Sequence, residues 1–188
     1  MEERILVCGS GPSLPKQLNS VNLDSFGTVV RVGMWQEIEG QDNRCDAWMF
    51  YPAHSQGEMD AMPLGMEEDI RSRSRKVNEL WLGYPGTTTR GMIITRRFMD
   101  YVISVEGRAK FCTESGLAVP RPDILALHMA MLRSKDVWAA GFDFYEGDTI
   151  YFSDEKPKEH ENPYPHDLLL KEKEWFMEQV RLGRVEVL

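Results

Sequence analysis

Short apolar runs alternate with polar segments along the whole chain, and each run has the length of one buried β-strand. The runs that predict strands lie at 5–8, 28–32, 47–51, 79–82, 136–140 and 184–187. Glycines and then a helix-like segment follow the first run directly, which is the usual beginning of a βα unit.

Amphipathic segments between the runs predict helices near 67–77, 91–104, 122–134 and 167–182. Pro122 suits the first position of a helix, and Asp123 favours the positive end of the helix dipole. The last helix carries an apolar stripe, formed by Leu168, Leu169, Trp175, Phe176 and Val180. Strands that alternate with helices predict an α/β fold, with a mostly parallel sheet and helices on both faces.

The segment 141–166 departs from this alternation, because it is polar, acidic and contains several prolines. A loop this long in a compact domain is usually functional, so the sequence predicts a lid here. The chain of 188 residues suits a single domain over 1–188, with no second one.

Charge and cysteine content exclude several classes of protein. The net charge of −8 argues against a nucleic-acid-binding protein, which needs a basic face. No apolar run approaches the roughly 18 residues of a transmembrane helix. The 3 cysteines have no metal-ligand spacing, and we expect buried thiols in a reducing cytoplasm.

The loop after the first strand is the first candidate for a binding site, since ligands of parallel sheets bind beyond the carboxyl ends of the strands. Gly9 and Gly11 allow the backbone to approach a ligand, Ser10 and Ser13 offer hydroxyls, and amides at a helix start attract phosphate. The run is neither a P-loop nor a dinucleotide fingerprint. A tight βα turn without a ligand is therefore the alternative.

The second candidate cluster is Asp143, Tyr145, Tyr151 and His166. Asp143 either caps its own turn or binds a ligand, and the tyrosines either pack or direct hydroxyls at a phosphate. His166 is either a surface or capping residue, or a general base. The other histidines are weaker candidates: His54, His160 and, as a packing residue within a helix, His128.

These residues together resemble bacterial sialyltransferases of glycosyltransferase family 42. The resemblance covers most of the chain, without the family's C-terminal extension, and rests on 9–14, Arg31, Cys45-x-Ala47, 141–145, Tyr151 and His166. It implies a Rossmann-like nucleotide-binding fold. The two lid tyrosines, which keep the family's spacing, are the most specific part.

The resemblance also implies a mechanism. His166 would deprotonate a hydroxyl of a glycan or glycolipid acceptor, which would attack a CMP-activated acidic sugar with inversion. Tyr145 and Tyr151 would stabilise the departing CMP with their hydroxyls. No Asp-x-Asp pair is present, so neither a metal nor another cofactor is expected. Members of the family are often oligomeric, which makes a homo-oligomer a possible state.

The chain departs from the family where side chains contact the donor. Ser10 and Gly33 replace asparagines, and so does Tyr51. Arg121, between two prolines, stands in the gapless position of a Ser/Thr-Gly turn, where it could bind an anion bidentately. With a gap, 114–116 would take that position. The expected donor-binding residues are Gly9, Ser10, Gly11, Ser13, Arg31, Tyr51, Arg121 and Asp143.

Two functions from different classes are thus expected. The first is the metal-independent transferase, located in the cytoplasm or peripherally on a membrane. The alternative is a catalytically silent nucleotide-binding or assembly protein on the same fold, which the departures favour and the tyrosines and His166 oppose. A phosphohydrolase would need clustered carboxylates at the strand ends, which the sequence does not contain.

Overall fold

The computed structural model describes residues 3–33, 35, 37–38, 40, 42–52, 65–144 and 166–188. Its strands are β1 (Arg4–Cys8), β2 (Thr28–Val32), β3 (Ala47–Met49), β4 (Glu79–Leu82), β5 (Tyr101–Val102), β6 (Asp136–Ala140) and β7 (Glu186–Val187). Its helices are α1 (Leu14–Leu18), α3 (Met66–Lys76), α4 (Thr88–Thr95), α5 (Val105–Ser115), α6 (Pro122–Arg133) and α7 (His166–Arg181), with short 3-10 turns at Leu23–Ser25 and Pro85–Thr87.

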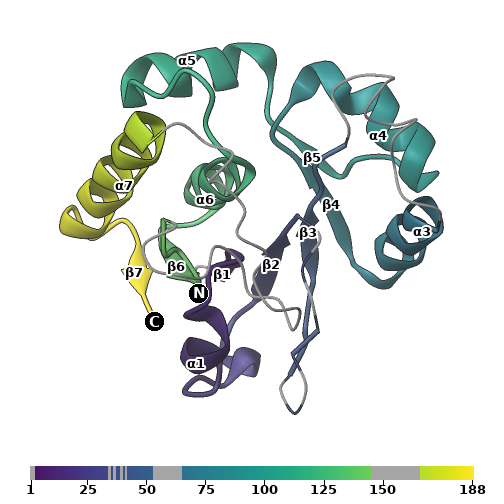
Figure 1. The fold of residues 1–188 in the computed structure, drawn as a ribbon, viewed down its shortest axis with the longest axis horizontal. Helices are drawn as coiled ribbons and strands as arrows, with labels where there is room; N and C mark the ends of the chain where they lie inside the picture. Colours follow the sequence, from purple (N-terminus) through teal and green to yellow (C-terminus); the bar gives the residue numbers. More distant parts are fainter. Residues whose placement is uncertain are drawn as a thin grey trace.

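All the strands of this part of the chain belong to one parallel sheet, in the order β5-β4-β3-β2-β1-β6-β7 (Figure 1). The α/β fold with a parallel sheet, predicted from the alternation of runs, is confirmed. After β1 the chain builds outward through β2 to β5, then returns through α5 and α6 to the other side of β1. The strand order therefore reverses between β1 and β6.

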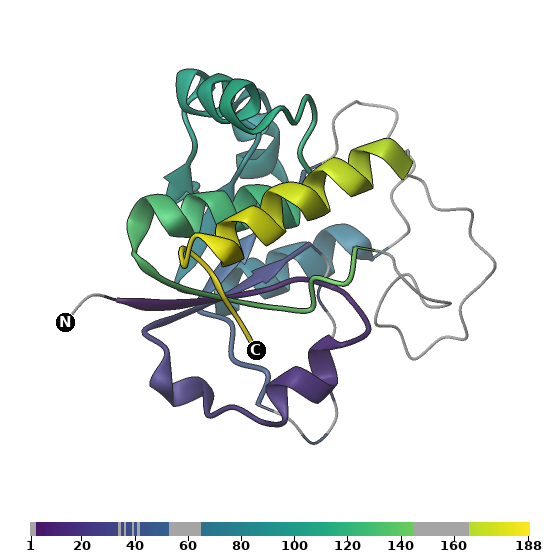
Figure 2. The ribbon, with the colours of Figure 1, turned by 90° about the vertical axis from the view of Figure 1, so that its left-hand side faces the viewer.

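Helices cover both faces of the sheet, as predicted. Alternate side chains of β1 point to opposite faces, with Ile5 and Val7 in one apolar cluster and Leu6 and Cys8 in another. The cluster around Ile5 includes residues of α5, α6 and α7, whereas the cluster around Leu6 includes those of α1. Figure 2 shows α5, α6 and α7 above the strands and α1 below them.

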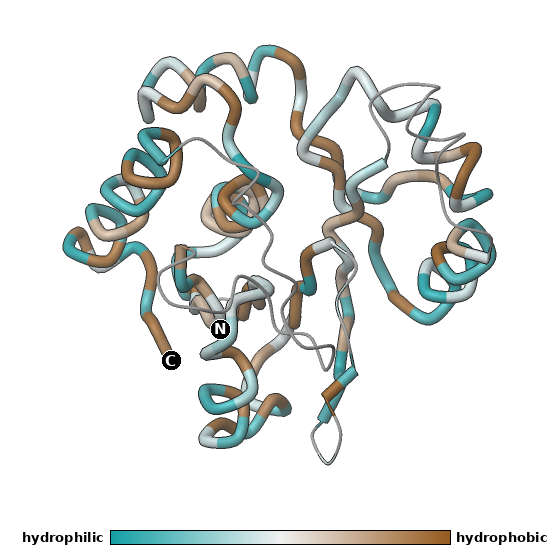
Figure 3. The backbone as a smooth tube through the Cα atoms, viewed as in Figure 1, coloured by the Kyte–Doolittle hydropathy of each residue, from teal (hydrophilic) through white to brown (hydrophobic). Residues whose placement is uncertain are grey.

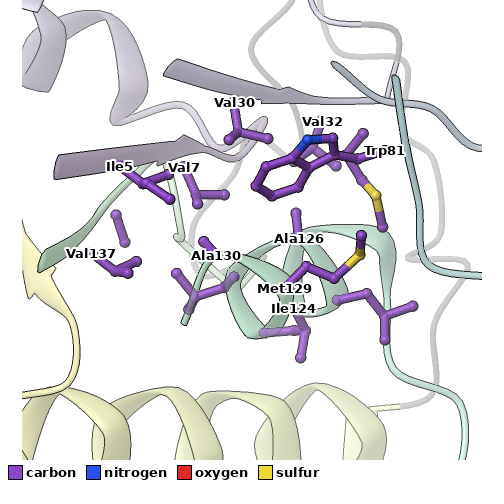
Figure 4. Packing of buried hydrophobic residues seen from close by; sticks show 14 of the residues in the cluster. Ile5, Val7, Val30, Val32, Trp81, Ile124, Ala126, Met129, Ala130 and Val137 are labelled. Carbon is purple, nitrogen blue, oxygen red and sulfur yellow. The ribbon is translucent and has the colours of Figure 1, made fainter. Parts of the chain in front are cut away.

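The centre of the core is formed by α6, which is buried on most of its surface. Ile124, Ala126, Met129 and Ala130 are each 0% exposed. In Figure 4, Ala126 and Ala130 lie on the side of α6 that faces the strands, whereas Ile124 points away from the sheet. The two alanines leave room for the large strand side chains at the closest approach of helix and sheet. This packing fixes the beginning of α6 beside the carboxyl edge of the sheet.

The prediction of one helix over 91–104 is wrong in both boundaries, because the helix in this region, α4, spans Thr88–Thr95. α4 ends at Thr95, and Arg96 has a φ of 54°, a left-handed conformation that an α-helix does not continue through. The two-residue edge strand β5 follows, and α5 begins at a cap in which the Ser104 hydroxyl accepts from the Gly107 amide (2.9 Å). α5 and β5 were not predicted, because α5 has little apolar periodicity and β5 is too short to form a run.

The other predicted elements agree with the structure to within a few residues. α6 begins at Pro122 as predicted, and Gly183 follows α7 with a φ of 65°. The third strand ends at Met49 rather than at residue 51, and the last strand is reduced to Glu186–Val187. Figure 3 shows hydrophobic and hydrophilic stretches alternating along α7, the pattern from which this helix was predicted.

Candidate functional site

The loops after β1 and β6 lie side by side at the point where the strand order reverses. The Gly9 amide donates to the carbonyl oxygen of Ala140 (2.8 Å), and the Gly11 amide donates to that of Gly141 (2.9 Å). This is the position where open α/β sheets bind their ligands. The structure thus brings 9–13 and 141–143, parts of the two candidate clusters, next to each other.

The glycines of the first loop are required for this contact between backbones. A Cβ at Gly9 would lie 2.5 Å from the carbonyl oxygen of Gly141, and one at Gly11 would lie 2.3 Å from Oδ2 of Asp143. Both distances are shorter than a van der Waals contact. Gly9 and Gly11 therefore hold the two loops together, whether or not a ligand approaches them.

We expect Gly9→Ala to lower the free energy of unfolding by about 1–3 kcal/mol, the usual cost of forcing an extra group into a packed site. Gly86→Ala is the matched control, because Gly86 is exposed and a Cβ there would meet nothing within 4 Å. Urea unfolding of both variants measures the difference. Equal midpoints for the two variants would show that the loops separate without cost.

Asp143 connects the second loop to Ser13, the residue directly before α1. Its Oδ2 accepts from the Ser13 amide (2.7 Å), while the Ser13 hydroxyl donates to Oε1 of Gln17 (3.1 Å). The same Gln17 oxygen accepts from the Gly141 amide (2.7 Å). The Ser13 amide, which was expected to bind a phosphate, thus donates its hydrogen bond to the carboxylate of Asp143 instead. Ser10 is exposed at the tip of the loop.

A cavity of about 650 Å³ opens next to this pair of loops. Residues of α7 form its other wall, and the full lining consists of Pro12, Ser13, Phe142, Asp143, Phe144, Lys173, Phe176, Met177, Val180 and Val187. The rings of Phe142 and Phe176 are stacked, with centroids 5.2 Å apart and an angle of 8° between their planes. The cavity has the size of a small-molecule site, with apolar walls and a few polar groups.

Phe144 adopts a left-handed conformation, with a φ of 50°. Non-glycine residues adopt it at some cost in free energy, and it is often found at functional sites. Its ring is buried, 5.3 Å from the ring of Phe176. This turn directs the Phe144 side chain into the wall of the cavity.

His166 is the first residue of α7 and is exposed. Lys173, which lines the cavity, lies two turns further on the same side of the helix, about 10 Å along the axis. Because α7 runs antiparallel to the strands, His166 lies at the carboxyl edge of the sheet. Tyr145, Tyr151, His54 and His160 fall outside the described residues, as does the lid from 145 to 165.

Arg121 is paired with an acidic residue of α7. Its Nε donates to Oε2 of Glu172 and its amide donates to Oε1 (2.7 Å), while Asp123 lies 3.5 Å from the guanidinium. Arg121 is 6% exposed and Glu172 0% exposed. This buried ion pair joins the start of α6 to the middle of α7. Binding of the donor by Arg121 stays a prediction.

Tyr51 follows β3 and packs edge-on against Tyr84, with ring centroids 5.2 Å apart. The Tyr84 hydroxyl donates to the carbonyl oxygen of Pro120 (2.7 Å), so both rings support the loop before α6. The gapped alternative for this loop places 114–116 at the end of α5, where Gly116 has a φ of 72°. Only the gapless position, 120–122, directly precedes α6.

Arg31 does not reach the cavity beside α7. Its neighbours in β2, Val30 and Val32, belong to the cluster under α6, so Arg31 points to the opposite face of the sheet. It is 1% exposed there. Of the predicted donor-binding residues, only Ser13 and Asp143 line the cavity, with Gly9 and Gly11 directly behind them.

Three residues of α7 were not predicted as part of the site: Lys173, Met177 and Glu172. Glu172 falls between Leu169 and Phe176 on the buried side of the helix, as the helical spacing of the three residues requires. A charge within an apolar stripe needs a buried partner. This signal could have identified the ion pair with Arg121.

A second cavity, of about 670 Å³, lies between α5, α6 and α7. His128 stacks on Phe111 in its wall, with centroids 4.0 Å apart, so the prediction of a packing histidine is confirmed. Burial lowers the pKa of His128 below its ordinary value of 6.5, and the nearby Glu114 opposes this shift.

The lowered pKa predicts an acid-sensitive contribution to stability. Between the folded and unfolded pKa values the unfolded chain binds more protons at this ring, so protonation favours unfolding. Relative to His128→Phe, which keeps the stacking, the wild type should be most stable above pH 6.5 and lose stability as the pH falls through the folded-state pKa. Urea midpoints of both proteins at about pH 7.5 and about pH 5 test this. A pH-independent difference would contradict it.

No family model matches the chain, and no curated protein matches it. Within the described ranges, no group of at least three His, Cys, Asp or Glu residues could hold a metal ion. Among the helices that the structure describes, none is long and apolar enough to cross a membrane.

Proposed function

We propose that this protein is a metal-independent glycosyltransferase similar to the bacterial sialyltransferases of family 42. It would transfer an acidic sugar from a CMP-sugar to a glycan or glycolipid acceptor with inversion. The proposal rests on the sequence resemblance and on the position of one cavity in the fold.

The observation that supports it most is the composition of the cavity between the loops after β1 and β6 and α7. One wall carries Ser13 and Asp143, and the other belongs to the helix that begins with His166. A donor in this cavity would have the glycine loop on one side and an acceptor site near His166 on the other. Chemistry that joins two substrates needs such an arrangement.

The charges of the cavity favour one orientation of the donor. Asp143 would repel a phosphate but can accept hydrogen bonds from ribose or sugar hydroxyls. Lys173 contributes a positive charge to the opposite wall. We therefore expect the phosphate on the α7 side. His166 would accept the acceptor proton, and the hydroxyls of Tyr145 and Tyr151 would stabilise the CMP leaving group.

A silent nucleotide-binding or assembly protein is the second candidate. It is favoured by two contacts that are already made within the protein: the Ser13 amide is bonded to Asp143, and Arg121 is bonded to Glu172. Both groups were expected to contact the donor. A protein without turnover could use them for stability alone.

Thermal denaturation with CMP, CDP, UMP, UDP, GDP and their sugars tests the proposed function. A nucleotide at about a hundred times its dissociation constant should stabilise the protein by about 2.7 kcal/mol. We expect CMP and CMP-sialic acid to raise the melting temperature, and release of CMP from the latter to continue in EDTA when an acceptor is present.

The outcomes separate the two candidates. Stabilisation by CMP without any release would favour the silent protein. Stabilisation only by UDP or GDP would contradict the CMP donor. Asp143→Asn is a useful comparison, since it removes the carboxylate charge while keeping an oxygen for the Ser13 amide.

A further inference from the structure

A buried arginine, Arg31, lies near the carboxyl end of β2 and points to the face of the sheet opposite α6. Arg31 pairs in register with Cys8, the last residue of β1. Its Nε donates to the carbonyl oxygen of Arg44 (3.2 Å), which fixes the guanidinium. Within the described residues, neither terminal nitrogen of Arg31 has a hydrogen-bond partner, and the indole nitrogen of Trp35 has none either. All three atoms are buried.

The charges around Arg31 do not balance within the described part of the chain. Arg44 is paired with Asp46 (2.9 Å), and Arg73 is paired with Asp69 (3.0 Å). Neither carboxylate is bonded to Arg31. The guanidinium lies 5.7 Å from the ring of Trp35, and that of Arg73 lies 5.3 Å from the same ring. Contact with a ring stabilises a cation but does not satisfy its N–H donors.

The neighbouring thiols do not supply the missing negative charge. Burial raises the pKa of Cys45 to about 12, although Arg31 opposes this shift. Burial also raises the pKa of Cys8. Both groups are thus neutral near pH 7, whereas a guanidinium remains protonated at any physiological pH. A buried cation with two unbonded N–H groups is strongly unfavourable unless an anion pairs with it.

We propose that Arg31 and Trp35 form a binding site for a phosphate- or sulfate-like oxyanion. A guanidinium can bind two oxygens of such a group at once through the two nitrogens that are unbonded here. The site is distinct from the cavity beside α7, because Arg31 lies on the opposite face of the sheet. It does not depend on the transferase activity, and it would bind the anion in a silent protein as well.

The test is the melting temperature of the full-length protein with inorganic phosphate, compared with sodium chloride of equal ionic strength. At about a hundred times the dissociation constant, phosphate should raise the melting temperature by about 5–10 °C. Arg75→Met, which removes an exposed arginine of α3, is the control and should respond as the wild type does.

Arg31→Met should lose the response to phosphate and should be at least as stable as the wild type in phosphate-free buffer, because an unpaired buried charge has been removed. Arg31→Lys keeps the charge but cannot bind bidentately, so it should need at least about tenfold more phosphate. An unchanged response in either variant would overturn the site. So would a wild type that phosphate does not stabilise beyond the chloride control.

CMP distinguishes the two sources of the phosphate group, a nucleotide or a free anion. If Arg31 binds the phosphate of a nucleotide, CMP should stabilise the wild type but not Arg31→Met, and inorganic phosphate should compete with CMP. If it binds a free anion, CMP should act equally on both proteins while inorganic phosphate acts only on the wild type. A protein that responds to phosphate and to no nucleotide would retain this site and lose the proposed function.

Discussion

Replacing His166 by alanine is expected to lower turnover by about 10²- to 10⁴-fold, the usual contribution of a positioned general base. His166 is exposed at the start of α7, so the substitution removes no packing from the core. The affinity for CMP should change little, because the phosphate is expected near Lys173, about 10 Å along the helix. The rate of CMP release with a saturating acceptor measures the effect.

His128→Phe is the matched control for this experiment. It removes a histidine from the second cavity, keeps an aromatic ring on Phe111, and should leave turnover unchanged. A His166→Ala protein with normal turnover and normal folding would contradict the role of His166 as a base. The histidine would then be only the first residue of a helix.

Replacing Glu172 by alanine should have the largest effect on stability, a loss of about 3–5 kcal/mol in the free energy of unfolding. The substitution removes the carboxylate that binds both Nε and the amide of Arg121, and it leaves a buried cation that lies 3.5 Å from the carboxylate of Asp123. Glu174→Ala, at an exposed position of the same helix, should change stability by less than about 0.5 kcal/mol. Urea unfolding gives both values.

A double variant separates the cost of the unpaired charge from the value of the pair. Arg121→Met with Glu172→Leu removes both charges and keeps most of the side-chain volume, so it should recover much of the stability lost in Glu172→Ala. A loss below about 1 kcal/mol in Glu172→Ala would mean that α7 is not fixed through this contact.

Local patterns predicted most of the fold. β2, β4 and β6 have the predicted boundaries, because their apolar runs are short and are bounded by glycine or by polar residues. α5 could not be predicted in this way, since Phe111 is its one buried residue and the helix shows little periodicity. The end of α4 depends on a single residue, Arg96, whose left-handed conformation no sequence pattern indicated.

The candidate site was only partly predictable, because its contacts join residues far apart in the chain. The two clusters around Gly9 and Asp143 were recognised from local composition. Their hydrogen bonds to each other depend on the pairing of β1 with β6, which the sequence does not reveal. The direction of Arg31 follows from the alternation along β2. That its two terminal nitrogens have no hydrogen-bond partner among the described residues depends on which loops pack over it.

Amide hydrogen exchange in the presence and absence of CMP tests most directly whether a nucleotide binds in the cavity between the two loops and α7. We expect slower exchange in peptides that cover 9–18, 140–144 and 170–180, and unchanged exchange in α3, which lies on the other face of the sheet. Unchanged exchange in all three segments at saturating CMP, or protection confined to other parts of the chain, would contradict the proposed site.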